Sequence, residues 1–147
     1  MLSWLISDPL PVGAQAPEFA LPDEKGNVVR LSDLRGRNVI LVFYPGDETP
    51  VCTRQLCEFR DSWDEVQKHN AVVYGINSQG AESHGRFIGN RRLPFPLLAD
   101  KGQKIGDLYN TRGLIVKRTV YLIGPDGKIR FARRGKPNPA EVLAAAA

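Results

Sequence analysis

Two continuous apolar runs interrupt an otherwise mixed pattern of apolar and polar positions. The first lies within Asn38 to Tyr44 and the second within Ala71 to Ile76. Runs of this length without polar residues are typical of strands buried on both faces of a sheet. Between them, Pro50 to about Asn70 carries apolar residues at three- and four-residue spacing, which predicts an amphipathic helix. The strand–helix–strand order implies two parallel strands joined by a right-handed crossover.

The remaining elements are shorter and are separated by turn residues. Glu18 to Leu21 and Val28 to Leu31 flank the turn Asp23 to Asn27 and predict an N-terminal β-hairpin, followed by a single helical turn that Gly36 ends. Two antiparallel strands are predicted at 118–123 and 128–132, helices at 83–90, 104–109 and 139–145, and an extended piece at 94–99. This order predicts an α/β thioredoxin-like fold, with a mixed central sheet covered on both faces.

The chain length of 147 residues suits one domain, and no linker or repeat divides it. We expect a single domain over 1–147, with 1–11 as an N-terminal extension whose Trp4, Leu5 and Ile6 cover apolar surface. No apolar run approaches the ~20 residues of a membrane span. The N-terminus also lacks the basic region of a signal peptide. We therefore expect no membrane association and a cytoplasmic location.

The net charge of +4 is modest, and the doublets Arg91-Arg92 and Arg133-Arg134 do not form a basic stripe. Aromatic residues are not interleaved with them, so we expect no nucleic-acid binding. Two cysteines do not make a disulfide scaffold, which favours a reducing compartment. Together with His69 and His84 they lack the spacing of a zinc site, and no glycine fingerprint follows a strand. We expect no metal and no organic cofactor.

Both cysteines lie in the segment Pro45 to Cys57, between the first buried strand and the predicted helix. Thr49 is the predicted N-cap, and Pro50 then occupies the first helical position, where its missing N–H is tolerated. This places Cys52 in the first turn, among unpaired backbone N–H groups and at the positive end of the helix dipole. Such a position stabilises a thiolate, at the carboxyl end of a strand where α/β sheets place their chemistry.

The spacing of Cys52 and Cys57 constrains any bond between them. Five residues along an ideal helix correspond to about 7.5 Å of rise and about 140° of rotation. The two Cα atoms would then lie roughly 8.7 Å apart, beyond the ~7 Å limit for a disulfide. If these cysteines bond to each other, the helix must unwind locally.

The residues Pro45, Thr49 and Cys52 form P-x-x-x-T-x-x-C, which resembles the peroxidatic motif of the peroxiredoxins. Cys57, five residues after Cys52, resembles the arrangement of the bacterioferritin comigratory protein and peroxiredoxin Q subfamily, whose resolving cysteine lies in the same helix. The resemblance covers roughly 12–144. The flanking blocks that carry it are Ala16 to Phe19, Leu31 to Gly36, Val42 to Pro45, Gly75-Ile76 and Arg118 to Ile123.

This resemblance implies a thiol-dependent peroxidase for hydrogen peroxide and organic hydroperoxides that needs no cofactor. It implies that Cys52 is the peroxidatic nucleophile, that Thr49 holds the thiolate and the peroxide, and that Pro45 shields the sulfur from water. Arg118 falls on the active-site arginine and Cys57 on the resolving cysteine. The Cys52 sulfenic acid would condense with Cys57 to an intramolecular disulfide, which thioredoxin or a similar thiol donor would reduce. A monomer is expected, because no C-terminal segment is available to carry a resolving cysteine to a partner.

Several alternatives remain open. Cys57 could be a bystander in a one-cysteine enzyme, and Lys117 or Arg112 could replace Arg118 as the cation. The chain could be a thioredoxin-like disulfide oxidoreductase, although it lacks the C-x-x-C pair, or a non-catalytic redox-sensing module. Asp47 and Glu48 would oppose a nearby thiolate, so we expect both to point to solvent.

Overall fold

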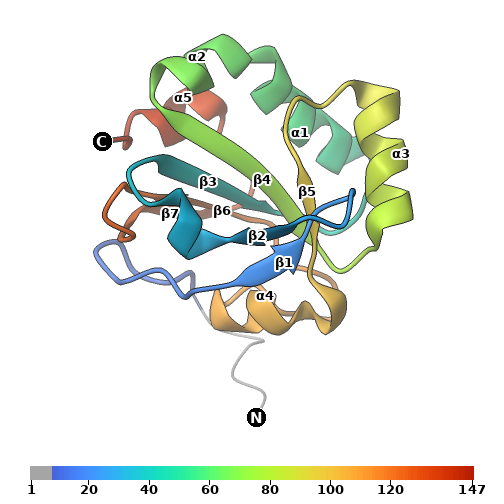
Figure 1. Ribbon diagram of the computed structural model, residues 1–147, viewed down its shortest axis with the longest axis horizontal. Coiled ribbons are helices and arrows are strands. Elements are labelled where there is room, and N and C mark those ends of the chain that lie inside the picture. The colour runs from blue at the N-terminus through green and yellow to red at the C-terminus, as the bar shows by residue number, and fades with distance from the viewer. Residues whose placement is uncertain (1–7) are drawn as a thin grey trace.

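The fold is built on a five-stranded mixed sheet with the order β5-β4-β3-β6-β7 (Figure 1). The computed structural model describes residues 8–147, so the expected packing of Trp4, Leu5 and Ile6 lies outside the described residues. β3 runs parallel to β4, and β4 parallel to β5, while β6 pairs antiparallel with both β3 and β7. The strands are β3 Asn38–Phe43, β4 Ala71–Asn77, β5 Leu97–Ala99, β6 Thr119–Ile123 and β7 Ile129–Arg134. The predicted parallel pair and antiparallel hairpin are both confirmed.

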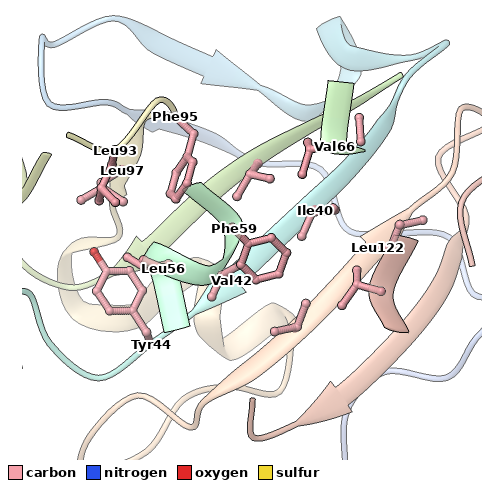
Figure 2. Packing of buried hydrophobic residues seen from close by; sticks show 14 of the residues in the cluster. Ile40, Val42, Tyr44, Leu56, Phe59, Val66, Leu93, Phe95, Leu97 and Leu122 are labelled. Carbon is pink, nitrogen blue, oxygen red and sulfur yellow. The ribbon is translucent and has the colours of Figure 1, made fainter. Parts of the chain in front are cut away.

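The central strand β3 is buried along its whole length, as its apolar run predicts. Its even-numbered residues Ile40 and Val42 point to one face, where they pack with α1 (Figure 2). Its odd-numbered residues Val39, Leu41 and Phe43 belong to a second cluster on the opposite face. Since side chains alternate along a strand, only a sheet covered on both faces can bury such a run.

Helices α1 Pro50–Asp61, α2 Trp63–Lys68, α3 Ala81–Arg91 and α5 Pro139–Leu143 contribute to the first cluster. The second cluster is closed by α4 Lys104–Leu108 and by the N-terminal hairpin of β1 Ala20–Pro22 and β2 Val28–Arg30. Short 3-10 helices cover Leu31–Leu34 and Lys101–Gln103. No helix within residues 8–147 is both long and apolar enough to cross a membrane.

The single helix expected from Pro50 to about Asn70 is wrong in one respect, because it is interrupted at Ser62. Ser62 adopts φ −101° and ψ 18°, which ends α1 and begins α2. Ser62 N–H still donates to the carbonyl of Glu58, and Val66 N–H donates to the carbonyl of Ser62, so helical hydrogen bonds continue on both sides of the break. Trp63, next to the break, is partly buried and packs against the first cluster.

Gly75 in β4 allows the close packing beside the end of β3. A Cβ at this position would lie 2.6 Å from Cδ2 of Leu97 and 3.0 Å from Cε1 of Tyr44. Tyr44, directly after β3, is fully buried and belongs to the same cluster as Leu56 of α1 (Figure 2). The missing side chain therefore lets the Tyr44 ring lie against the sheet.

We predict that Gly75→Ala destabilises the fold by about 1–3 kcal/mol, because the new methyl group overpacks the core. The free energy of unfolding in urea measures this effect. Gly89→Ala is the matched control, because a Cβ there meets no atom within 4 Å. It should be neutral or stabilise the protein by up to about 1 kcal/mol, since alanine favours the helix. Equal losses in the two variants would contradict the packing explanation.

Candidate active site

The start of α1 carries the sulfur of Cys52. Thr49 is the N-cap residue in an extended conformation, with φ −73° and ψ 151°, and Pro50 occupies the first helical position. Cys52 is consequently the third helical residue, as the sequence predicts, and it is fully buried against the core. A short loop from Tyr44 to Thr49 connects this position to the end of β3.

The Thr49 side chain does not cap the helix, contrary to its expected role. Its hydroxyl donates to the carbonyl oxygen of Gly46 at 3.1 Å, and no cap hydrogen bond is made. Within residues 8–147, no group accepts a hydrogen bond from the backbone N–H of Val51 or Cys52. These two donors therefore remain available to an anionic group at the helix N-terminus.

Arg118 contacts the sulfur directly. Its Nη2 lies 3.3 Å from Sγ of Cys52, and its Nη1 donates to Oε1 of Gln55 at 2.7 Å. The sheet register explains this placement, because β6 pairs antiparallel with β3 and sets Thr119 opposite Phe43. The residue before β6 thus meets the loop that follows β3. Lys117, one of the alternative cations, makes no side-chain hydrogen bond to Cys52 within residues 8–147, and burial and the neighbouring Arg134 lower its pKa.

Gln55 is a site residue that the sequence did not single out. It is 1% exposed, and its Nε2 reaches the carbonyl oxygen of Gly135 at 3.4 Å. Its place three residues after Cys52 is the signal that could have identified it, since residues three apart share one helix face. As a neutral acceptor, Gln55 orients the guanidinium of Arg118 without cancelling its charge.

Cys57 lies about 1.4 turns further along the same helix. It is partly exposed and packs at the edge of the first cluster, and both thiols are free. Helix α1 is continuous from Pro50 to Asp61, so the two cysteines occupy one regular helix. The need to unwind before a disulfide forms stays a prediction. Pro45 is half-buried in the loop before α1.

The expectation that Asp47 points to solvent is wrong. Its side chain is 2% exposed, and hydrogen bonds from four other side chains surround its carboxylate. These bonds satisfy the charge locally, so Asp47 does not act as a free anion beside Cys52. Glu48 is exposed, as expected, and accepts a hydrogen bond from Asn90 at 2.7 Å. Within residues 8–147 no cluster of three or more His, Cys, Asp or Glu side chains could hold a metal ion.

Comparison with known proteins places this geometry in a family. The AhpC/TSA family profile matches residues 12–132. "Peroxiredoxin Q, chloroplastic" from Oryza sativa subsp. japonica is 39% identical over 134 residues, which cover 86% of this chain and 60% of that protein. The chain therefore spans less than two thirds of the length of this rice relative. "Putative peroxiredoxin bcp" from Coxiella burnetii is 39% identical over 129 residues, which cover 80% of this chain and 84% of that protein.

Solved structures agree with the sequence comparison. The crystal structure of peroxidoxin BcpB from Mycobacterium tuberculosis superposes with a TM-score of 0.86 at 31% identity, covering 95% of this chain and 96% of that one. A structure of Xanthomonas campestris peroxiredoxin Q gives a TM-score of 0.79 at 26% identity, covering 86% and 88% of the two chains. The thioredoxin-like fold expected from the sequence is thereby confirmed. The chain belongs to the AhpC/TSA family and, within it, to the group of peroxiredoxin Q and bacterioferritin comigratory proteins.

Proposed function

We propose that this protein is a thiol peroxidase that reduces hydrogen peroxide and organic hydroperoxides through Cys52. The observation that carries the proposal is the contact of 3.3 Å between Arg118 Nη2 and the buried sulfur in the first turn of α1. A guanidinium and a helix N-terminus both favour the thiolate over the thiol, and the thiolate is the nucleophile. Family membership supports the same chemistry.

In the proposed reaction, the Cys52 thiolate attacks one peroxide oxygen in line with the O–O bond. That bond breaks, and the second oxygen leaves with the electron pair and takes up a proton as water or an alcohol. Arg118 and the free N–H groups of Val51 and Cys52 stabilise the charge on the leaving oxygen. The Thr49 hydroxyl donates its hydrogen to the carbonyl oxygen of Gly46. Its oxygen lone pairs then accept a hydrogen bond from the peroxide. Pro45 limits the access of water to the sulfur.

The resulting Cys52 sulfenic acid then condenses with the thiol of Cys57. This step forms the S–S bond and releases water. Because both cysteines lie on one helix, resolution needs no second copy of the chain. A thioredoxin-type dithiol returns the protein to its reduced state by exchange, which suits a reducing compartment such as the cytoplasm.

The roles of the two cysteines are tested by intact mass after one equivalent of hydrogen peroxide. The wild-type protein should lose two hydrogens as the disulfide forms. Cys57→Ser should gain one oxygen as a persistent sulfenic acid, because its resolving thiol is missing. Cys52→Ser should not react.

Two results would contradict these assignments. If Cys57→Ser turns over with thioredoxin at the wild-type rate, Cys57 is a bystander and the enzyme has one catalytic cysteine. If the wild-type protein does not react within seconds, the peroxidase proposal is refuted.

We predict that Arg118→Gln lowers the second-order rate constant of Cys52 with hydrogen peroxide by about a hundredfold to a thousandfold, because a donor to the developing charge is lost. Rapid-mixing kinetics at neutral pH measure this rate constant. Arg112→Gln removes the same charge from an exposed side chain and should leave the rate unchanged. A loss in Arg112→Gln instead would transfer the role to that arginine.

Formation of the disulfide should unwind α1 locally between Cys52 and Cys57, because regular helix geometry keeps the two Cα atoms too far apart. Hydrogen exchange should show lower protection of Thr53 to Glu58 in the oxidised protein than in the reduced one. Helix α3 serves as an internal control and should exchange equally in both states. Equal protection of Thr53 to Glu58 in the two states would disprove the unwinding.

A further inference from the structure

Buried and half-buried polar side chains that the proposed reaction does not use connect the loop between β3 and α1 to α3. We call this group the Asp47 network. Its members are Tyr44, Asp47, Asn77, Gln79, Ser83 and His84. Asp47 stands at its centre, in the middle of the loop between Pro45 and Thr49. Ser83 and His84 come from α3, 36 and 37 residues away in the sequence.

Four side-chain donors surround the Asp47 carboxylate. Oδ1 accepts from Tyr44 Oη at 2.5 Å and from Asn77 Nδ2 at 3.1 Å. Oδ2 accepts from Ser83 Oγ at 2.6 Å and lies 2.7 Å from His84 Nδ1. The Asn77 amide is oriented because its Oδ1 accepts from the backbone N–H of Gln79 at 2.8 Å. Hydrogen bonds from this many donors stabilise the ionised form of a carboxyl group.

The pKa shifts of Asp47 and Tyr44 agree with an ionised Asp47 carboxylate. Burial alone would raise the pKa of the Asp47 carboxyl, but the hydrogen bonds from His84, Ser83 and Tyr44 lower it overall. Burial, followed by the Asp47 charge, raises the pKa of Tyr44 well above its ordinary value. Tyr44 therefore stays protonated and remains a donor.

An ionised Asp47 decides the proton positions on His84. The His84 Nε2 lies 3.0 Å from the carbonyl oxygen of Leu98, which can only accept, so Nε2 carries a proton. Nδ1 faces a carboxylate and must also donate. This hydrogen-bond pattern is the one that an imidazolium makes beside a carboxylate, and the side chains of His84 and Asp47 are 0% and 2% exposed.

The network reaches the reacting centre through one peptide group. The backbone N–H of Asp47 donates to Gln79 Oε1 at 2.6 Å. The carbonyl of the same peptide, on Gly46, accepts the Thr49 hydroxyl at 3.1 Å. Because a peptide group is planar, fixing its N–H and the adjacent Asp47 side chain also fixes its carbonyl. The direction of the Thr49 hydroxyl follows from that carbonyl.

We propose that the buried Asp47–His84 ion pair consists of positioning residues that orient the Gly46–Asp47 peptide, and through it the Thr49 hydroxyl, for reaction with peroxide. The proposal rests on the peroxidase function proposed above. Neither side chain reaches the sulfur in the structure. They act on peroxide reduction through Thr49, and not on the nucleophilicity of Cys52.

Asp47 and His84 have to be replaced together, because each partner compensates the other. Removing one partner of a buried ion pair leaves an uncompensated charge and strongly destabilises a fold. The double variant Asp47→Asn/His84→Asn removes both charges together and keeps an amide donor near the position of Nδ1. Glu48→Gln is the matched control, because it removes a carboxylate from the neighbouring, exposed position of the same loop.

Two reactions of Cys52 separate positioning from general structural damage. Reduction of hydrogen peroxide uses the Thr49 hydroxyl, whereas alkylation of Cys52 by iodoacetamide, followed in a Cys57→Ser background, requires the thiolate but not that hydroxyl. In the double variant the peroxide rate constant should fall at least tenfold while the alkylation rate changes less than twofold. Glu48→Gln should change neither rate. The proposal is overturned if the double variant reduces peroxide within twofold of wild type, or if both reactions slow together.

The charge state of His84 can be measured on the wild-type protein, whatever the stability of the variants. The chain contains only two histidines, so the ring nitrogens of His84 are assigned in ¹⁵N spectra by comparison with a His69→Gln variant. At pH 7 both ring nitrogens of His84 should carry protons. A neutral ring would overturn the ion pair. A wild-type protein that fails to react with peroxide at all would instead refute the proposed function, while the ring nitrogens would still report on the pair.

Discussion

The antiparallel register between β3 and β6 determines the chemistry of this protein. It sets Phe43 opposite Thr119, so the chain leaving β3 meets the chain entering β6 at one edge of the sheet. The first turn of α1 and the guanidinium of Arg118 are thereby brought within 3.3 Å of each other. A shift of one residue would turn every side chain of the strand to the opposite face and separate the two groups. The buried core on both faces of β3 makes such a shift unfavourable.

Helix α1 must meet two opposing requirements in the proposed cycle. The reduced protein needs a regular first turn, because that turn presents Cys52 and its backbone N–H groups to the substrate. The oxidised protein needs the same turn to open before Cys57 can reach the sulfur. The buried Leu56 and Phe59 hold the helix in place while it is reduced. The break at Ser62 separates this helix from α2, so a local change in α1 need not extend to the whole crossover between β3 and β4.

The groups around the site leave the positive charge of Arg118 directed at the sulfur of Cys52. Arg118 is held by Gln55, which is a neutral acceptor, and its charge therefore remains directed at the sulfur. The carboxylate of Asp47 is not a free charge, because four side-chain donors, His84 among them, compensate it. An acidic residue in the loop before Cys52 is thus compatible with the proposed chemistry when hydrogen-bond donors compensate its charge.

The sequence by itself determined the elements whose cause is local. Continuous apolar runs predicted β3 and β4 as buried strands, Thr49 and Pro50 predicted the start of α1, and the spacing of the cysteines placed both on one helix. These features depend on neighbours a few residues away. Resemblance to the family added Arg118, which no local pattern would have marked.

Only the tertiary structure decided which polar side chains are buried and which residues form hydrogen bonds with them. Asp47 reads as a solvent-facing acid in the sequence, yet its partners Ser83 and His84 come from a helix 36 and 37 residues further on. Gln55 has a role only because Arg118, 63 residues away, reaches it. The capping hydrogen bond expected from Thr49 is replaced by one to Gly46, and the helix break at Ser62 left no clear mark in the apolar spacing. A local pattern records which side chains prefer burial, whereas the partners that make burial of a charge favourable are fixed by the packing of remote segments.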